Sequence, residues 1–160
     1  MSAEKLIQTL DKLLKLHQNL YEVTLQKTEM LKQNQVEELR ELLKKEQMYV
    51  QAIKQVEDER VRKTAEYLGG SEEVTLSACI NKATGSEKEV LQNILTNFTN
   101  VMDYLKNQNQ LNKELTKQAL QLTSITLDTL FPKETNVNYD KPLNKPLQEK
   151  QRRSIFDSKA

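Results

Sequence analysis

The sequence is poor in the residues from which most catalytic and metal sites are built. Its 160 residues include one cysteine, one histidine, no tryptophan, three glycines and three prolines. A single cysteine can form neither a disulfide framework nor a structural zinc site. The three glycines do not form the GxGxxG or GxxxxGK[ST] patterns that cradle phosphates. We therefore expect neither an enzyme nor a protein that depends on a cofactor or a metal.

An excess of charge of one sign and long apolar runs are also lacking. The chain has 24 basic and 23 acidic residues, for a formal net charge of +1, so no strong field favours nucleic acid or membranes. It has no run of about 18 apolar residues, which a membrane-spanning helix requires. The N-terminus is amphipathic, contains Glu4 and Asp11, and lacks the apolar core of a secretory signal. We expect a cytoplasmic protein without stable membrane insertion.

Glycine and proline interrupt helices, and here they are confined to two parts of the chain. Neither occurs between Met1 and Leu68 or between Ser86 and Phe131, and all three prolines follow Phe131. The sequence therefore predicts a helical region over residues 1–131 and a tail over 132–160. Its predicted helices span about 3–32, 35–67 and 87–131, with a flexible joint at 69–86 that has room for a short helix at about 72–82.

Apolar residues recur at steps of three and four in each long block, which is typical of coiled-coil seams. We expect an all-α fold, an elongated antiparallel three-helix coiled-coil bundle with a disordered C-terminal tail. Capping boxes at Asn34–Glu37 and Ser86–Glu89 would open the second and third helices. The predicted stripe of the second helix consists of Val36, Leu39, Leu43, Val50 and Ile53, with Leu42, Tyr49 and Val56 alongside.

The end of the third helix differs from the rest of the chain. Residues 118–132 carry one charge, Asp128, and their apolar side chains cover a broad arc of the helix. We expect this longest helix to extend beyond its partners, and exposing each large side chain would cost about 1.5–3 kcal/mol. The arc therefore predicts a docking surface for a helix of another protein, although residues 72–82 or a second copy of the chain could also cover it. Its residues are Leu115, Ala119, Leu120, Leu122, Ile125, Leu127, Leu130 and Phe131.

Several single residues have simple structural interpretations. His17 falls on the core stripe of the first helix, where a boundary histidine with a hydrogen-bond partner is expected. Cys79 is expected to act as a small buried apolar residue. Gln108 and Asn112 fall in the apolar seam of the third helix, where polar residues fix the register of packing.

The order of these features resembles the FlgN family of bacterial flagellar export chaperones. The resemblance covers the whole chain and includes a Leu-rich opening helix with Leu13, Leu14 and Leu20, a charged second helix and the Leu-Thr-rich stretch 120–123. The tail residues Asn138-Tyr139-Asp140 and the closing stretch 154–160 look like those of Bacillus-type members.

The resemblance implies a cytosolic chaperone that binds hook–filament junction (hook-associated) proteins of the FlgK and FlgL type. Such a chaperone keeps these proteins from polymerising and delivers them to the flagellar type III export gate. The family holds its substrate with its C-terminal part, which here corresponds to Leu115–Phe131. A tyrosine beyond the last helix, here Tyr139, is implied to dock on the cytoplasmic domain of the gate protein FlhA. The alternative is a structural coiled-coil adaptor or homo-oligomer without an export role.

Overall fold

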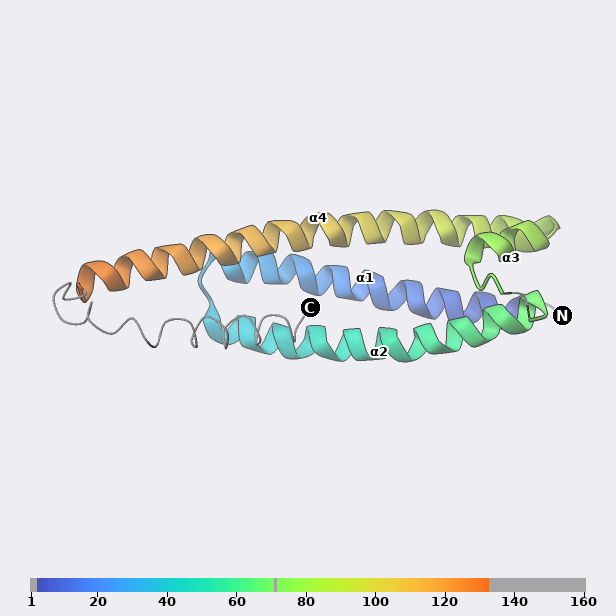
Figure 1. Cartoon of the computed structure of the whole chain (residues 1–160), viewed down its shortest axis with the longest axis horizontal. Coiled ribbons are helices and arrows are strands. Elements are labelled where there is room, and N and C mark those ends of the chain that lie inside the picture. Colours follow the sequence, from blue (N-terminus) through green and yellow to red (C-terminus); the bar gives the residue numbers. More distant parts are fainter. Residues whose placement is uncertain (1–2, 71, 133–160) are drawn as a thin grey trace, which may run out of the picture. The chain divides into compact units, whose positions relative to one another are not determined.

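The structure is a computed structural model that describes residues 3–70 and 72–132. Its helices are α1 (Glu4–Lys32), α2 (Val36–Leu68), α3 (Leu76–Lys82) and α4 (Gly85–Leu130) (Figure 1). No strand occurs in this part of the chain, so the prediction of an all-α fold is confirmed. The chain divides into two compact units, Met1–Leu120 and Gln121–Ala160, which are described separately below. The predicted tail, Tyr139 included, lies outside the described residues apart from Pro132.

Helices α1 and α2 form an antiparallel hairpin in the first unit (Figure 1). Near the start of α1, the Thr9 hydroxyl donates to the Glu59 carboxylate near the end of α2, at 3.5 Å. Near the end of α1, Lys27 forms a 3.3 Å ion pair with Glu46 in the first half of α2. The hairpin predicted from the short polar break between the two helices is therefore confirmed.

The turn of this hairpin differs from the predicted capping box. Asn34 has φ +53°, the left-handed region, and the Gln35 N–H donates to the Met30 carbonyl at 3.1 Å. This is the Schellman arrangement that ends a helix, and asparagine adopts it more readily than most residues. Asn34 therefore closes α1 and does not cap α2, whose N-cap, Gln35, makes no side-chain cap bond.

The predicted core stripe of α2 is confirmed only in part, since Leu39 and Ile53 are half-buried but the other three members are exposed. Val36, Leu43 and Val50 are 63%, 44% and 49% exposed. The neighbouring row faces α1 instead, and it includes Leu42, Tyr49, Val56 and Tyr67, of which Val56 and Tyr67 are buried. The two rows lie about 100° apart, so the 3-4 pattern alone could not decide between them.

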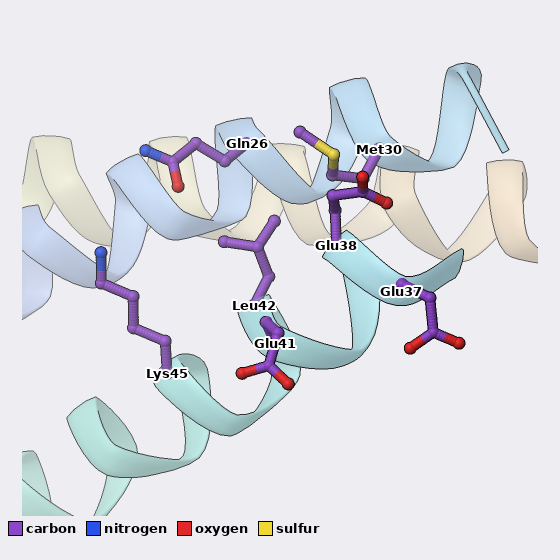
Figure 2. Close-up of a pocket in the computed structure, with 7 residues that line it drawn as sticks. All are labelled: Gln26, Met30, Glu37, Glu38, Glu41, Leu42 and Lys45. Carbon is purple, nitrogen blue, oxygen red and sulfur yellow. The ribbon is translucent and has the colours of Figure 1, made fainter. Parts of the chain in front are cut away.

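An open hollow of about 490 Å³ lies between α1 and α2 near their connecting turn. Figure 2 shows Leu42 pointing toward α1, next to Met30, while Glu37 and Glu41 point away from α1. Both outward carboxylates belong to exposed ion pairs on their own helix, with Arg40 at 3.7 Å and Lys44 at 3.1 Å. The hollow therefore has an apolar floor, which includes Met30 and Leu42, and acidic side chains along its edge.

Helix α4 runs parallel to α1 within the first unit. The Ala3 N–H donates to the Glu87 carboxylate at 3.1 Å, and the rings of Tyr21 and Tyr104 are 5.7 Å apart. These partners differ by nearly the same number of residues, as two parallel helices in register require. Helix α4 begins at Gly85, one residue before Ser86, the predicted cap. Glu87 in its first turn thus holds the start of α1.

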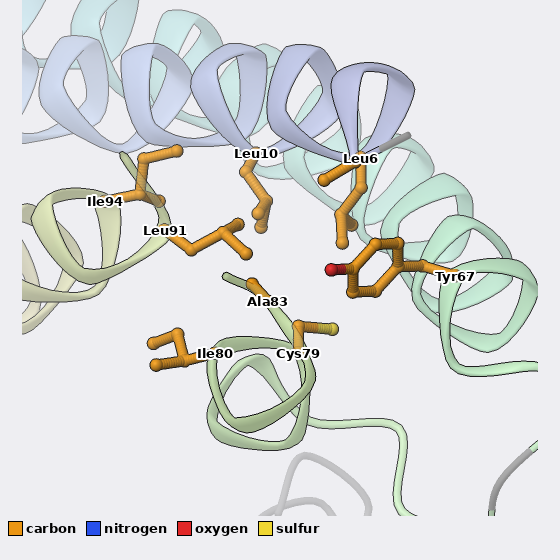
Figure 3. Packing of buried hydrophobic residues seen from close by; sticks show 9 residues of the cluster. Leu6, Leu10, Tyr67, Cys79, Ile80, Ala83, Leu91 and Ile94 are labelled. Carbon is orange, nitrogen blue, oxygen red and sulfur yellow. The ribbon is translucent and has the colours of Figure 1, made fainter. Parts of the chain in front are cut away.

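The short helix α3 forms within the predicted joint and packs into the main core. The Thr75 hydroxyl caps it by accepting a 3.1 Å hydrogen bond from the Ala78 N–H. Lys82 at its end donates to the Tyr67 carbonyl, and its ammonium lies 4.9 Å from the centre of the Tyr67 ring. The four helices contribute to one cluster (Figure 3), whose buried members are Ala3, Leu6, Leu10, Tyr67, Cys79, Ile80, Ala83, Leu91 and Ile94.

Candidate functional site

Two kinds of feature are absent from the residues that the structure describes. Over residues 3–70 and 72–132 there is no group of three or more His, Cys, Asp or Glu side chains able to hold a metal ion. In the same part of the chain, every helix is too short or too polar to cross a membrane.

The two residues most often used in covalent and acid–base chemistry have structural roles here. Cys79 is fully buried, and this burial raises the pKa of its thiol, although Arg60 and Lys82 act in the opposite direction. A protonated, buried thiol is a poor nucleophile. His17 is half-buried, its Nδ1 lies 2.8 Å from the Leu13 carbonyl oxygen, and its ring meets Phe98 edge-on at 5.6 Å. The interpretations of both residues from the sequence are confirmed.

The first part of α4 uses its apolar seam to pack within the first unit. Leu91, Ile94, Val101 and Leu105 are all buried, and Phe98 is half-buried between them. This part of the predicted seam is confirmed.

A buried polar network interrupts the seam between α1 and α4. The Asn112 amide donates to the Thr24 carbonyl at 3.0 Å, and its oxygen accepts from the Thr28 hydroxyl at 2.5 Å. Gln108 donates to the same Thr28 oxygen at 2.5 Å. Buried polar groups that are all satisfied specify one alignment of two helices, because any shift would leave them unpaired. The predicted register role of Gln108 and Asn112 agrees with this geometry.

Beyond Asn112 the apolar side chains of α4 become progressively more exposed. Leu115 and Ala119 are half-buried, and Leu120, at the end of the first unit, is 66% exposed. In the second unit the remaining residues of the predicted surface are exposed to 61% (Leu122), 63% (Ile125), 52% (Leu127), 66% (Leu130) and 73% (Phe131). We call the residues from Leu120 to Phe131 the α4 end surface.

The threonines of the α4 end surface make it more apolar than its composition suggests. The hydroxyls of Thr126 and Thr129 each donate to the carbonyl one turn earlier, Leu122 and Ile125, at 2.9 Å. Hydroxyls bonded back to their own helix have less need of an external partner. Asp128 is the one charged residue between Leu120 and Phe131, so this surface offers a partner mainly uncharged side chains.

Two features were not found by inspection of the sequence. One is the acidic-rimmed hollow between α1 and α2, which depends on how the two helices are set against each other. The other is an open groove of about 560 Å³ between α1 and α4, lined by the paired Tyr21 and Tyr104 and by several amide side chains. No sequence motif marks either feature, because each requires the register of two helices.

Comparison with known proteins shows which family the chain resembles. The family model described as FlgN protein matches residues 1–146. A Bacillus subtilis (strain 168) protein called YvyG, described as uncharacterized, is 45% identical over 160 residues, which cover 100% of both chains. No solved structure matches. Because the family model and this relative each extend over most or all of the sequence, the chain belongs to the FlgN protein family.

Proposed function

We propose that this protein is a flagellar export chaperone that acts in the cytoplasm on hook-associated proteins of the FlgK and FlgL type. Membership in the FlgN family gives the general class of function. The chaperone binds its substrates before assembly, prevents their premature polymerisation and delivers them to the flagellar type III export gate.

The observation that carries this proposal is the exposure of the α4 end surface. Five large apolar side chains of the second unit, from Leu122 to Phe131, are each more than half exposed. Leaving such groups in water costs about 1.5–3 kcal/mol each relative to burial, so a surface of this kind is typical of a protein-binding site. We assign substrate binding to this surface together with the half-buried Leu115 and Ala119, which precede it on the same helix.

In the proposed mechanism the chaperone covers an apolar surface of its substrate, and no covalent step is required. A terminal segment of the substrate lays the apolar side of a helix along α4, which removes both apolar faces from water. While covered, the substrate segment cannot pair with another substrate molecule. Release follows when the export machinery competes for the same segment, because no covalent bond holds it.

We further propose that Tyr139 docks the chaperone on the cytoplasmic domain of the gate protein FlhA. This residue lies outside the described part of the chain, and its role is carried over from the family resemblance alone. We also propose that α1, α2 and α4 form an elongated antiparallel three-helix coiled-coil bundle over residues 1–131.

The double variant Leu122→Asp/Ile125→Asp tests the substrate site. Two charges in the centre of the α4 end surface would have to be desolvated on binding, so we expect affinity for a hook-associated protein to fall at least about 100-fold. Isothermal titration calorimetry measures the affinity, and circular dichroism checks that helicity is unchanged. Met102→Asp is the matched control, because Met102 is also an exposed apolar residue of α4, at 49%, but lies outside the surface.

Unchanged affinity of the Leu122→Asp/Ile125→Asp variant would refute this site. Tyr139→Ala should lose binding to the FlhA cytoplasmic domain and keep full affinity for the substrate. If sedimentation showed that the free chain is a stable dimer, and the Asp variant a monomer, the alternative of a homo-oligomeric adaptor would be favoured instead.

A further inference from the structure

The last ten residues of α4 are helical although none of them is even half-buried. Every residue over 121–130 is exposed, whereas Leu91 and Leu105 of the same helix are buried. Most helices in proteins owe their stability to the packing of one face, because a short helix in water is marginal by itself. We call residues 121–130 the α4 end segment, and its helix lacks this support.

The residue types of the α4 end segment favour a helix only weakly. β-branched residues lose side-chain freedom in a helix, and Ser and Asp compete for backbone hydrogen bonds. The hydroxyls of Thr126 and Thr129 bond back to carbonyls of their own helix, which slightly weakens and bends it. Residues of these unfavourable kinds occupy six of the ten positions, namely Thr123, Ser124, Ile125, Thr126, Asp128 and Thr129.

The charges of the α4 end segment do not compensate for these residue types. Asp128 lies in the last turn of α4, which contains no basic residue. The free carbonyl groups at the end of a helix carry partial negative charge, so a carboxylate there is unfavourable. In α2, by contrast, Glu57 and Arg60 form a 2.6 Å ion pair one turn apart, and Asp128 has no such partner among the described residues.

We propose that the α4 end segment is only marginally stable as a helix in the free chain and becomes fully helical when a substrate covers it. The identity of the covering partner rests on the proposed function. On binding, exposed side chains such as Leu122 and Ile125 gain the burial that the free segment lacks. Helix formation continues from Leu120 without a new nucleus, so the helical population falls from there towards Leu130.

This coupling of folding to binding has two consequences for a chaperone. The apparent affinity is lowered by the fraction of chains that are already helical, which favours later release. A segment that orders only on its partner can also adapt to more than one partner. One surface can thereby serve hook-associated proteins of both the FlgK and the FlgL type.

Amide hydrogen exchange of the full free chain tests the marginal helix without any substrate. The amides of 121–130 should exchange within about tenfold of the rate of an unstructured peptide, and those of 91–105 at least about 1,000-fold more slowly. Adding an excess of a hook-associated protein should slow exchange over 121–130 at least about 100-fold. Equal protection of the two regions in the free chain would overturn the proposal.

A matched pair of variants tests the coupling to binding. Ser124→Ala/Asp128→Ala and Ser124→Gly/Asp128→Gly remove the same polar groups, but Ala and Gly differ about fivefold per site in the helix–coil equilibrium. If the substrate must first have the segment folded, the Ala variant should bind a hook-associated protein at least about tenfold more tightly than the Gly variant. Isothermal titration calorimetry measures both affinities.

Thr99 provides the control in the packed part of α4. It is exposed, and its hydroxyl also bonds back to its own helix, to the Leu95 carbonyl at 2.9 Å. Because this part of α4 is helical with or without substrate, Thr99→Ala and Thr99→Gly should differ in thermal unfolding and bind the substrate equally.

The outcomes separate this inference from the proposed function. Equal affinity of the Ala and Gly variants at 124 and 128 would show that the segment is already fully helical in the free chain, which overturns the inference while the substrate site stands. If no variant and not even the parent chain binds a hook-associated protein, the proposed function fails. Hydrogen exchange of the free chain then still decides whether the helix of 121–130 is marginal.

Discussion

The two parts of α4 have the same sequence pattern and opposite surroundings. From Leu91 to Leu105 the apolar residues at steps of three and four are buried, apart from the half-buried Phe98. From Leu120 to Phe131 residues of the same types are more than half exposed. Both parts are regular α-helix within one element, Gly85–Leu130, so helix formation does not distinguish them. They differ in whether another side chain lies against the seam.

This comparison shows what a periodic pattern can and cannot determine. The pattern identifies which side chains of a helix share a face, because that follows from 3.6 residues per turn. It does not say whether a neighbouring helix of the same chain covers that face. Helix α2 makes the same point in another way, since of its two adjacent apolar rows one packs against α1 and the other is exposed.

The largest expected effect is on stability and comes from comparing two leucine-to-alanine substitutions, one in each part of α4. Leu91 is fully buried in the main cluster, so Leu91→Ala should lower the free energy of unfolding by about 2–5 kcal/mol, through lost burial and the cavity left behind. Leu122 is 61% exposed, and Leu122→Ala should change the same quantity by less than about 0.5 kcal/mol. Urea unfolding followed by circular dichroism measures both.

If the two substitutions destabilised the chain equally, the α4 end surface would be part of the core in solution, and the comparison would fail. The same measurement in the presence of a bound substrate sharpens it. Leu122→Ala should then reduce the extra stability that the substrate confers, because the stability gained from a ligand rises with the logarithm of its affinity.

A smaller effect is expected from the polar network that separates the two parts. Asn112→Ala leaves the Thr24 carbonyl and the Thr28 hydroxyl without this partner in a buried place, which should cost about 1–3 kcal/mol. Thr28→Val removes the hydroxyl that donates to the Asn112 side chain. In a double-mutant cycle the two should be coupled by about 0.5–3 kcal/mol.

Thr126→Val is the matched control for the network. Its hydroxyl bonds only to a carbonyl of its own helix and is exposed, so its loss should change stability by less than about 0.5 kcal/mol. Strict additivity of Asn112→Ala and Thr28→Val would show that the network does not act as a unit.

Much of the fold follows from the sequence because its signals are local or periodic. The all-α class follows from the distribution of glycine and proline together with the 3-4 spacing, and the boundary role of His17 follows from its place on the stripe of α1. The α1–α2 hairpin follows from a short polar break between two amphipathic blocks. Each of these inferences needs only the geometry of a single helix or of the segment that joins two.

The rest depends on relations between elements that no local pattern contains. Asn34 has the side chain of a helix N-cap, but its backbone adopts the left-handed conformation that closes α1, and asparagine is suited to both. The choice between the two rows of α2 depends on how the hairpin is wound. The apolar α4 end surface could be named from the sequence, but its partner could be suggested only through the family resemblance.

The smallest expected effect concerns pH and is confined to the covered part of the molecule. Burial raises the pKa of Tyr67 and of Cys79, which lie in the same cluster. A group whose pKa is raised by folding binds its proton more tightly in the folded state, so its contribution to stability is complete below the ordinary pKa and is lost as the pH rises above it. For the thiol this loss starts near its ordinary value of 9.0, and for the phenol near 10.0.

Thermal unfolding at a series of pH values on either side of 9.0 measures this contribution. The melting temperature of the parent chain should fall with rising pH, and that of Cys79→Ala should fall less steeply. Comparing slopes within each variant removes the constant packing cost of the substitution. Tyr67→Phe should flatten the curve only above 10.0. An identical slope for Cys79→Ala and the parent chain would mean that the thiol is exposed to water in solution. The cluster around α3 would then be more open than the structure shows, in which Cys79 is fully buried.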